Sequence, residues 1–248
     1  MKPPTRQNPF ALGWEAARAN LLPALLIQAL MLALLAAYYL SPAAHRALWE
    51  LAAYKAQQGW RFVLVASVLA GAIVPEIFLV CFFQRGRPRR QNLHNLLFTI
   101  PIWALDGWIV DLLYRGEATW LGDVVTIRVV LAKICVDQFG YNPFFADPFG
   151  VLTYEWKNRG FSWESLGRTF TWPHYREKIV PTLCATWVVW IPLMAMIYSL
   201  PLALQFPLFS LALVFWVLLL TYMTNRFAAE NSRAADAPAV LSVAETIR

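Results

Sequence analysis

Ionisable side chains inside otherwise apolar stretches are the residues of this chain whose types and spacing could do chemistry. Six of them fall in segments long enough to cross a bilayer: Glu76, Asp106, Asp111, Arg128, Lys133 and Asp137. A charge at the centre of a bilayer costs about 2.5–3.5 kcal/mol even on insertion-based scales, so such groups face partners or water rather than lipid. We therefore expect a polar seam that pairs charges, guides an ion or exchanges protons.

Depth along the predicted helices suggests partners within this seam. Each helical residue rises about 1.5 Å, and successive spans run in opposite directions. Asp111 then lies level with Arg128, and Asp106 lies level with Lys133. Lys133 and Asp137 are four residues apart, so they share one helix face and can interact directly.

Glu76 and Asp137 come out at a similar depth, toward the cytoplasmic side. Neighbouring carboxylates repel, so one would be protonated, or a cation or water would lie between them. We interpret this pair as a titratable gate of a solute path, with the lysine and arginine as anion attractors or pair partners. A seam with all six groups ionised favours weak cation preference or pH gating. The alternative is a static salt-bridge seam that sets helix register.

The composition indicates which elements must position these groups. The 248 residues are 59% hydrophobic and only 15% charged, whereas soluble domains are near half apolar and a quarter charged. A membrane-spanning helix needs about 20 apolar residues. Six stretches approach or exceed this length: 21–40, 60–83, 93–114, 124–146, 180–200 and 207–223. We expect an all-α fold, a polytopic transmembrane helical bundle.

The loop at 84–91 sets the expected orientation. Arg85, Arg87, Arg89 and Arg90 crowd between the second and third spans. Cytoplasmic loops retain Lys and Arg, so this loop and both termini are expected in the cytoplasm. The arginines are also expected to touch anionic lipid head groups. Contact with a nucleic-acid backbone is the weaker alternative, because the loop is short and joins two spans.

The rest of the chain divides into three expected parts. Residues 1–59 form an N-terminal extension with one hydrophobic helix, residues 60–224 form the main bundle, and residues 225–248 form a poorly ordered tail. The connection at 147–178 is rich in aromatic residues and is expected to lie along the membrane interface. We expect an integral protein of a bacterial inner membrane, or of an organelle membrane in a eukaryote.

Catalytic and metal-binding signals are thin. His45, His94 and His174 stand in three separate loop or boundary positions, which does not suit a di-metal centre. His174 and Glu177 are one helical turn apart and are interpreted as an interfacial salt-bridged pair. No nucleophile-elbow, phosphate-loop or Cys-x-x-Cys pattern occurs. We expect neither enzymatic activity nor a cofactor nor a metal.

The second half of the chain carries two spaced motifs. Lys133, Asp137, Gln138 and Pro143 form a K-x3-D-Q-x4-P pattern. A K-x2-P-T-L-x-A-x-W-x-V-W-x-P pattern follows, formed by Lys178, Pro181, Thr182, Leu183, Ala185, Trp187, Val189, Trp190 and Pro192, and then come Pro201 and Trp216. This set resembles the Mpv-seventeen/PMP-twenty-two family of small integral membrane proteins, found in peroxisomal and mitochondrial inner membranes and in bacterial relatives.

The resemblance covers roughly the last 60% of the chain. It implies a small helical bundle, usually of four spans, with channel-like behaviour toward small solutes. The first half departs from the family pattern, because the early Gly-Asp and Gln are not evident and only Gly71, Pro75 and Glu76 hint at them. In the next helix, Ile109 follows Trp108 where the family has a Trp-Tyr pair.

Two functions remain open at this point. The first is channel-like conduction of small solutes or ions through the charged seam. The second is a non-conducting membrane scaffold that organises lipids or partner proteins. The expected partners are membrane lipids and a small solute or ion, with a homo-oligomer left open and no nucleic acid. For the tryptophans at 187 and 190 and the proline at 192, packing and a kink at a helix crossing are the plainer interpretation.

Overall fold

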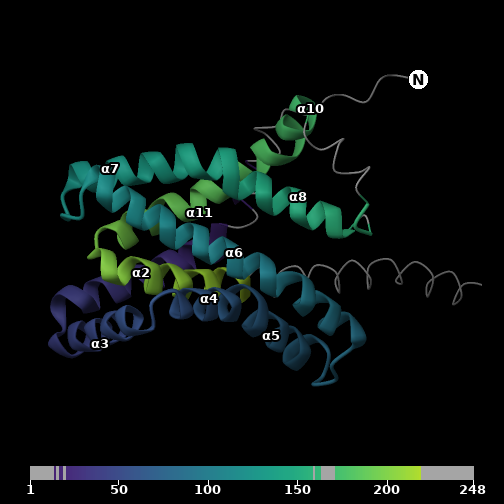
Figure 1. Cartoon of the computed structure of the whole chain (residues 1–248), viewed down its shortest axis with the longest axis horizontal. Coiled ribbons are helices and arrows are strands. Elements are labelled where there is room, and N and C mark those ends of the chain that lie inside the picture. The colour runs from purple at the N-terminus through teal and green to yellow at the C-terminus, as the bar shows by residue number, and fades with distance from the viewer. Residues whose placement is uncertain (1–13, 15–16, 19–20, 159, 163–170, 219–248) are drawn as a thin grey trace, which may run out of the picture. The chain divides into compact units, whose positions relative to one another are not determined.

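The computed structural model describes residues 14, 17–18, 21–158, 160–162 and 171–218 (Figure 1). Regular secondary structure in this part of the chain is entirely helical. In chain order, the elements are α2 (Leu21–Leu40), α3 (Pro42–Gln58), α4 (Trp60–Val68), η1 (Leu69–Ile73), α5 (Val74–Phe83), α6 (Arg90–Leu121), α7 (Ile127–Val136), η2 (Asp137–Ala146), α8 (Asp147–Asn158), α10 (Trp172–His174), η3 (Tyr175–Ile179), α11 (Val180–Tyr198) and a helix at Leu202–Leu218.

Four described helical stretches are long and apolar enough to cross a membrane. They are Leu21–Leu40, Trp60–Phe83, Arg90–Leu121 and Trp172–Tyr198. The first two have the bounds expected from the sequence. The third extends at both ends beyond the expected 93–114, and the fourth begins before the expected 180–200 but ends two residues earlier, at Tyr198. The expected span at 124–146 is helical from Ile127 onward, and the one at 207–223 overlaps a shorter apolar helix. The all-helical, membrane-compatible class is confirmed.

In the described part of the chain, three π-helical segments, η1, η2 and η3, interrupt the α-helices, and each lies beside or around a proline. Pro75 follows η1, Pro143 lies inside η2, and Pro181 follows η3. Proline lacks the N–H that continues an α-helical ladder, and a wider turn is one way to accommodate it. The helices do not end at these points: α7, η2 and α8 follow one another without a gap (Figure 1).

The chain forms two compact units. The first comprises Met1–Gln57 and Asp111–Phe209. Within it, α11 packs against α2, α7 and η2, and α8 packs against η3. The core uses residues at helical spacing, such as Val189, Leu193 and Ile197 on α11, all fully buried. This spacing places one continuous apolar stripe of α11 against its neighbours.

The second unit comprises Gln58–Val110 and Ser210–Arg248. Its helices α4, η1 and α5 lead through a loop at 84–89 into the first part of α6. Gly71 packs directly against Trp103 of α6, because a Cβ at position 71 would lie 2.1 Å from the indole Cδ2. Nearer the loop, the Asn92 side-chain amide donates a hydrogen bond to the Glu76 carboxylate. These contacts define an antiparallel helical hairpin. The division of the chain at residue 60 stays a prediction, and the expected tail at 225–248 lies outside the described residues.

Candidate functional site

Among the described residues of the first unit, four charged side chains are buried, namely Asp111, Glu117, Lys133 and Asp137, and the last three form one group. Glu117 of α6 is 0% exposed, Lys133 of α7 is 2% exposed, and Asp137 at the start of η2 is 5% exposed. The hydroxyl of Tyr198, at the end of α11, donates a hydrogen bond of 3.2 Å to Asp137 Oδ2. We call Glu117, Lys133, Asp137 and Tyr198 the Lys133 cluster. Charges are almost never fully buried without partners, so this cluster is the candidate site.

Tyr198 is the centre of this cluster. The Lys133 Nζ lies 5.7 Å from the centroid of its ring, within range of a cation–π contact. The Glu117 carboxyl lies beside the same tyrosine and within electrostatic range of both Lys133 and Asp137. Tyr114 packs edge-on against Tyr198, with ring centroids 5.6 Å apart. One hydroxyl and one ring therefore bring together groups from four helical elements.

The pairing expected between Lys133 and Asp137 is wrong in its detail. Among the described residues no salt bridge joins them, although both are buried within the same cluster. The backbone between the two residues is still α-helical, since the Asp137 N–H donates to the Lys133 carbonyl, so the four-residue spacing places them on one face without joining their charges. Both residues instead contact Tyr198. The Lys133 ammonium group lies over the Tyr198 ring, and the Tyr198 hydroxyl donates a hydrogen bond to the Asp137 carboxylate.

The pairing expected between Asp111 and Arg128 is also wrong. Asp111 forms a salt bridge of 2.9 Å with Lys55 of α3 and a second with Arg115, one turn along α6. Within the described part of the chain no salt bridge joins Arg128 to it, and Arg128 is exposed. The Lys55 Nζ also lies 5.1 Å from the ring centroid of Phe206. Lys55 was not expected as a partner because it lies between the predicted spans 21–40 and 60–83.

The remaining seam residues belong to the second unit. Glu76 is half-buried and accepts a hydrogen bond from Asn92. Asp106 is half-buried on α6. Their expected relations to Asp137 and Lys133 connect the two units and stay predictions. Of the six charges, only Lys133 and Asp137 therefore lie in one cluster with Glu117, and both belong to the first unit.

Sequence reasoning missed Glu117, which was assigned to a loop beyond the third span. The helix instead continues to Leu121. Asp111, Tyr114 and Glu117 are spaced by three residues, and all are buried on one face of α6. This i, i+3, i+6 spacing was visible in the sequence, and it is the signal that could have placed Glu117 on the same helix face as Asp111 and Tyr114.

Residues of the two spaced motifs have a specific structural role. In η2, the N–H of residue 143 would ordinarily bond to the carbonyl of residue 138, but Pro143 has no N–H. The indole Nε1 of Trp187 donates to this Gln138 carbonyl at 2.7 Å. Likewise, Pro192 has no N–H for the Val188 carbonyl of α11.

Polar side chains of neighbouring elements also donate hydrogen bonds to the carbonyl oxygens of Val188, Val189 and Pro143, which lie at or near the prolines. The Gln28 amide of α2 donates to Val188 O at 3.0 Å and to Val189 O at 3.2 Å. The hydroxyl of Tyr175 donates to Pro143 O at 2.9 Å. Because unpaired buried carbonyls are costly, these contacts allow prolines inside packed helices.

A further buried carboxyl lies just beyond the expected span at 124–146. Asp147, the first residue of α8, accepts a hydrogen bond of 3.4 Å from the Thr186 hydroxyl on Oδ1. Its Oδ2 is buried and has no hydrogen-bond partner in the described part of the chain. Burial raises the pKa of Asp147 to about 7, because the charged form loses its hydration. This carboxyl is therefore poised to change its charge near neutral pH.

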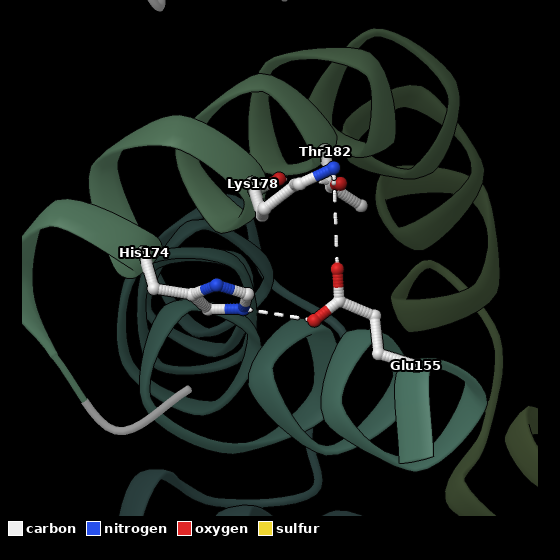
Figure 2. Close-up of polar contacts among 4 residues, drawn as sticks. All are labelled: Glu155, His174, Lys178 and Thr182. Carbon is white, nitrogen blue, oxygen red and sulfur yellow. Dashed lines mark hydrogen bonds and ion pairs between the residues drawn. The ribbon is translucent and has the colours of Figure 1, made fainter. Parts of the chain in front are cut away.

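The interfacial pair expected between His174 and Glu177 is wrong. The His174 Nε2 instead lies 3.2 Å from Glu155 Oε2 of α8 (Figure 2). Lys178 reaches the other oxygen of Glu155 at 4.0 Å, and Thr182 caps the Lys178 carbonyl through its hydroxyl at 2.9 Å. These contacts tie α8 to the helical stretch that begins at α10. Among the described residues no group of three or more acidic, histidine or cysteine side chains could hold a metal ion.

In comparisons with protein-family models, with curated proteins and with solved structures, no match was found.

Proposed function

We propose that this chain is an integral membrane protein that conducts small solutes or ions through the Lys133 cluster. The observation that carries the proposal is the burial of Glu117, Lys133 and Asp137 at one place within the first unit. Ionisable residues within membrane helices mark ion and solute pathways and are functional candidates by default. The resemblance of the two spaced motifs to the Mpv-seventeen/PMP-twenty-two family supports the same function.

The proposed topology has six spans, with both termini in the cytoplasm of a bacterium. Four helices of sufficient length and hydropathy support it. The helix that carries Lys133 would be a further span, shielded by its neighbours rather than by its own hydropathy. In the described conformation the cluster is closed to solvent, so conduction requires the side chains around Tyr198 to separate. The proposed protein is therefore gated.

Flux from liposomes tests the conduction proposal. Wild-type protein is compared with Lys133→Met and Asp137→Asn for ionic current and small-solute efflux between about pH 5 and 8. Arg128→Gln is the matched control, because it removes an exposed cation from the same helix. We expect wild-type flux, and a change in cation-to-anion permeability ratio of roughly threefold or more in the cluster variants only. Absence of flux from folded, inserted wild-type protein would contradict conduction.

The alternative proposal is a non-conducting scaffold that organises lipids or partner proteins. The observation that favours it is the same near-complete burial, since a sealed cluster can also fix helix register. Under this alternative, Lys133→Met lowers the free energy of unfolding while no flux exists to be altered. Measuring flux and unfolding on the same preparations separates the two functions.

A further inference from the structure

The second unit presents a concentrated and uncompensated positive charge, independent of the conduction proposal. Arg85, Arg87, Arg89 and Arg90 lie within residues 84–90, which we call the arginine loop, and all four are exposed. Among the described residues no carboxylate forms a salt bridge with any of them. Glu76, the acid nearest in sequence, is engaged by Asn92. The loop therefore retains its full charge for an external partner.

Hydrogen bonds hold the arginine loop in a defined conformation. The N–H of Gly86 donates to the Val80 carbonyl at 2.9 Å, and glycine suits its φ of 71°. At the other end, the N–H of Arg89 donates to the Asn92 side chain, which closes the first turn of α6. The same Asn92 reaches back to α5 through Glu76. A ligand would thus meet guanidinium groups on a backbone that is already ordered.

Apolar surface begins directly on both sides of the arginine loop. Phe82 before it is 71% exposed, and Leu93 and Leu97 after it are 59% and 64% exposed. The helical stretches on both sides, Trp60–Phe83 and Arg90–Leu121, are long and apolar enough to cross a membrane. A loop between two such helices lies at the boundary of hydrocarbon and water. This is the depth of lipid phosphates.

We propose that the arginine loop binds the phosphate of anionic phospholipid head groups. Guanidinium groups form paired hydrogen bonds with phosphate oxygens, and Arg is preferred over Lys for such contacts. The first N–H groups of α6 have no partner within the helix and favour a negative charge nearby. The exposed Phe82 and Leu93 would lie against the acyl chains of the same lipid.

The test uses the purified full chain in neutral detergent micelles. Dioleoyl phosphatidylglycerol is titrated in, with dioleoyl phosphatidylcholine as the neutral lipid of equal chain length, and the thermal unfolding midpoint reports binding. One variant changes Arg85, Arg87, Arg89 and Arg90 to Gln. The matched control changes four other exposed arginines to Gln: Arg46, Arg61, Arg128 and Arg176. Both variants lower the formal net charge from +6 by four charges.

We expect wild type to prefer phosphatidylglycerol by about tenfold or more, and the loop variant to lose that preference. In the control variant, the affinity ratio between the two lipids should stay within about twofold of the wild-type ratio. Salt screens exposed charges that lie far from the head group, so removing them changes binding little. Equal loss in both variants, or equal binding of both lipids by wild type, would overturn the proposal. So would complete displacement of the lipid by millimolar inorganic phosphate or by a 20-nucleotide single-stranded DNA, each of which indicates a different ligand.

A second measurement covers the case in which the loop variant does not fold. Wild-type preference for phosphatidylglycerol is measured as the salt concentration rises from about 0.05 M to 0.5 M, where screening shortens the reach of exposed charges. If the loop binds the head group, the preference for phosphatidylglycerol over phosphatidylcholine should decline severalfold as the salt concentration rises. A preference that does not change with salt contradicts the proposal, because it would come from acyl chains alone.

Discussion

The side-chain amide of Gln28 donates a hydrogen bond of 3.0 Å to the carbonyl oxygen of Val188, four residues before Pro192. The proline removes the N–H that would otherwise occupy this carbonyl, and a side chain from α2 takes its place. A polar residue in the middle of an apolar helix thus has a defined partner on α11. The contact joins α2 to α11 in the core of the first unit.

Gln28→Leu is expected to lower the free energy of unfolding by about 1–3 kcal/mol, because the Val188 carbonyl is left without a donor. Pro192→Ala restores an N–H at that position, so the double variant should recover much of the loss. Denaturant unfolding in micelles of wild type, the two single variants and the double variant gives the coupling free energy between positions 28 and 192. Additive effects of the two substitutions would show that the glutamine does not substitute for the missing N–H.

Gly71→Ala should destabilise the helical hairpin, because the added methyl group meets the Trp103 indole at 2.1 Å. Overpacking of this kind costs about 1–3 kcal/mol. Gly116→Ala is the matched control, since nothing lies within 4 Å of a Cβ there and alanine favours the helix. Thermal unfolding should place the two variants on opposite sides of wild type. A neutral Gly71→Ala would mean that the tryptophan has room to move.

Lys133→Met should cost roughly 2–4 kcal/mol in the free energy of unfolding, because it leaves the buried Glu117 and Asp137 without a nearby cation. Adding Glu117→Gln removes one of these carboxylates and should recover part of the loss. The control Arg128→Gln changes an exposed side chain and should stay within about 0.5 kcal/mol of wild type. A double-mutant cycle measured at one pH provides the coupling energy.

Stability should fall as the pH rises from about 4 to about 7, in part because of Asp147. Its pKa is raised from 3.8 to about 7 in the folded chain, so the folded state holds a proton that the unfolded state has already lost. This contribution is fully present below about pH 4 and is lost as the pH passes 7, with a total on the order of 2–4 kcal/mol.

Asp147→Asn removes the carboxyl group that binds this proton. The free energy of unfolding should therefore change less with pH between about 4 and 7. Asp123→Asn is the control, because Asp123 is an exposed carboxyl. The measurement is the denaturant midpoint at pH steps between about 4 and 8. An unchanged slope in Asp147→Asn would assign the pH dependence to other groups.

Glu155→Gln should weaken the attachment of α8 to the stretch that begins at α10, because the carboxylate meets both His174 and Lys178 (Figure 2). The contact is partly exposed, so the expected loss is only about 0.5–1 kcal/mol and shrinks at high salt. Glu177→Gln removes an exposed carboxylate one turn from the histidine and should have no comparable effect. Unfolding at low and high salt compares the two variants.

Apolar run length predicted the helices well where residues that break the pattern flank the run. The bounds of α2 and of the Trp60–Phe83 stretch agree with expectation because Pro42, Gly59 and the arginine loop follow or precede them. The end of α6 was placed too early, at Tyr114, because the polar run that follows resembles a loop. That run instead continues the helix to Leu121, with Glu117 buried on the same face as Asp111 and Tyr114.

The candidate site was predicted in part. Lys133 and Asp137 were identified from the cost of burying charge, and both are buried. Their contacts were not, because partners such as Tyr198 and Lys55 depend on how distant helices pack. A π-helical segment also changes which residues share a face, and nothing in a one-dimensional pattern marks where that segment begins.

The ten residues of η2 make the chain tolerant of a shortened sequence at this place. A π-helical turn contains about one residue more than an α-helical turn, so deleting one residue there can return the backbone to an ordinary α-helix without breaking it. The helix after the deletion keeps nearly the same rotation about its axis, so Asp147 and Glu155 stay near their partners. A deletion in an α-helical segment such as α7 instead rotates everything after it by about 100°. A deletion between 137 and 146 should therefore cost less stability than a deletion between 127 and 136.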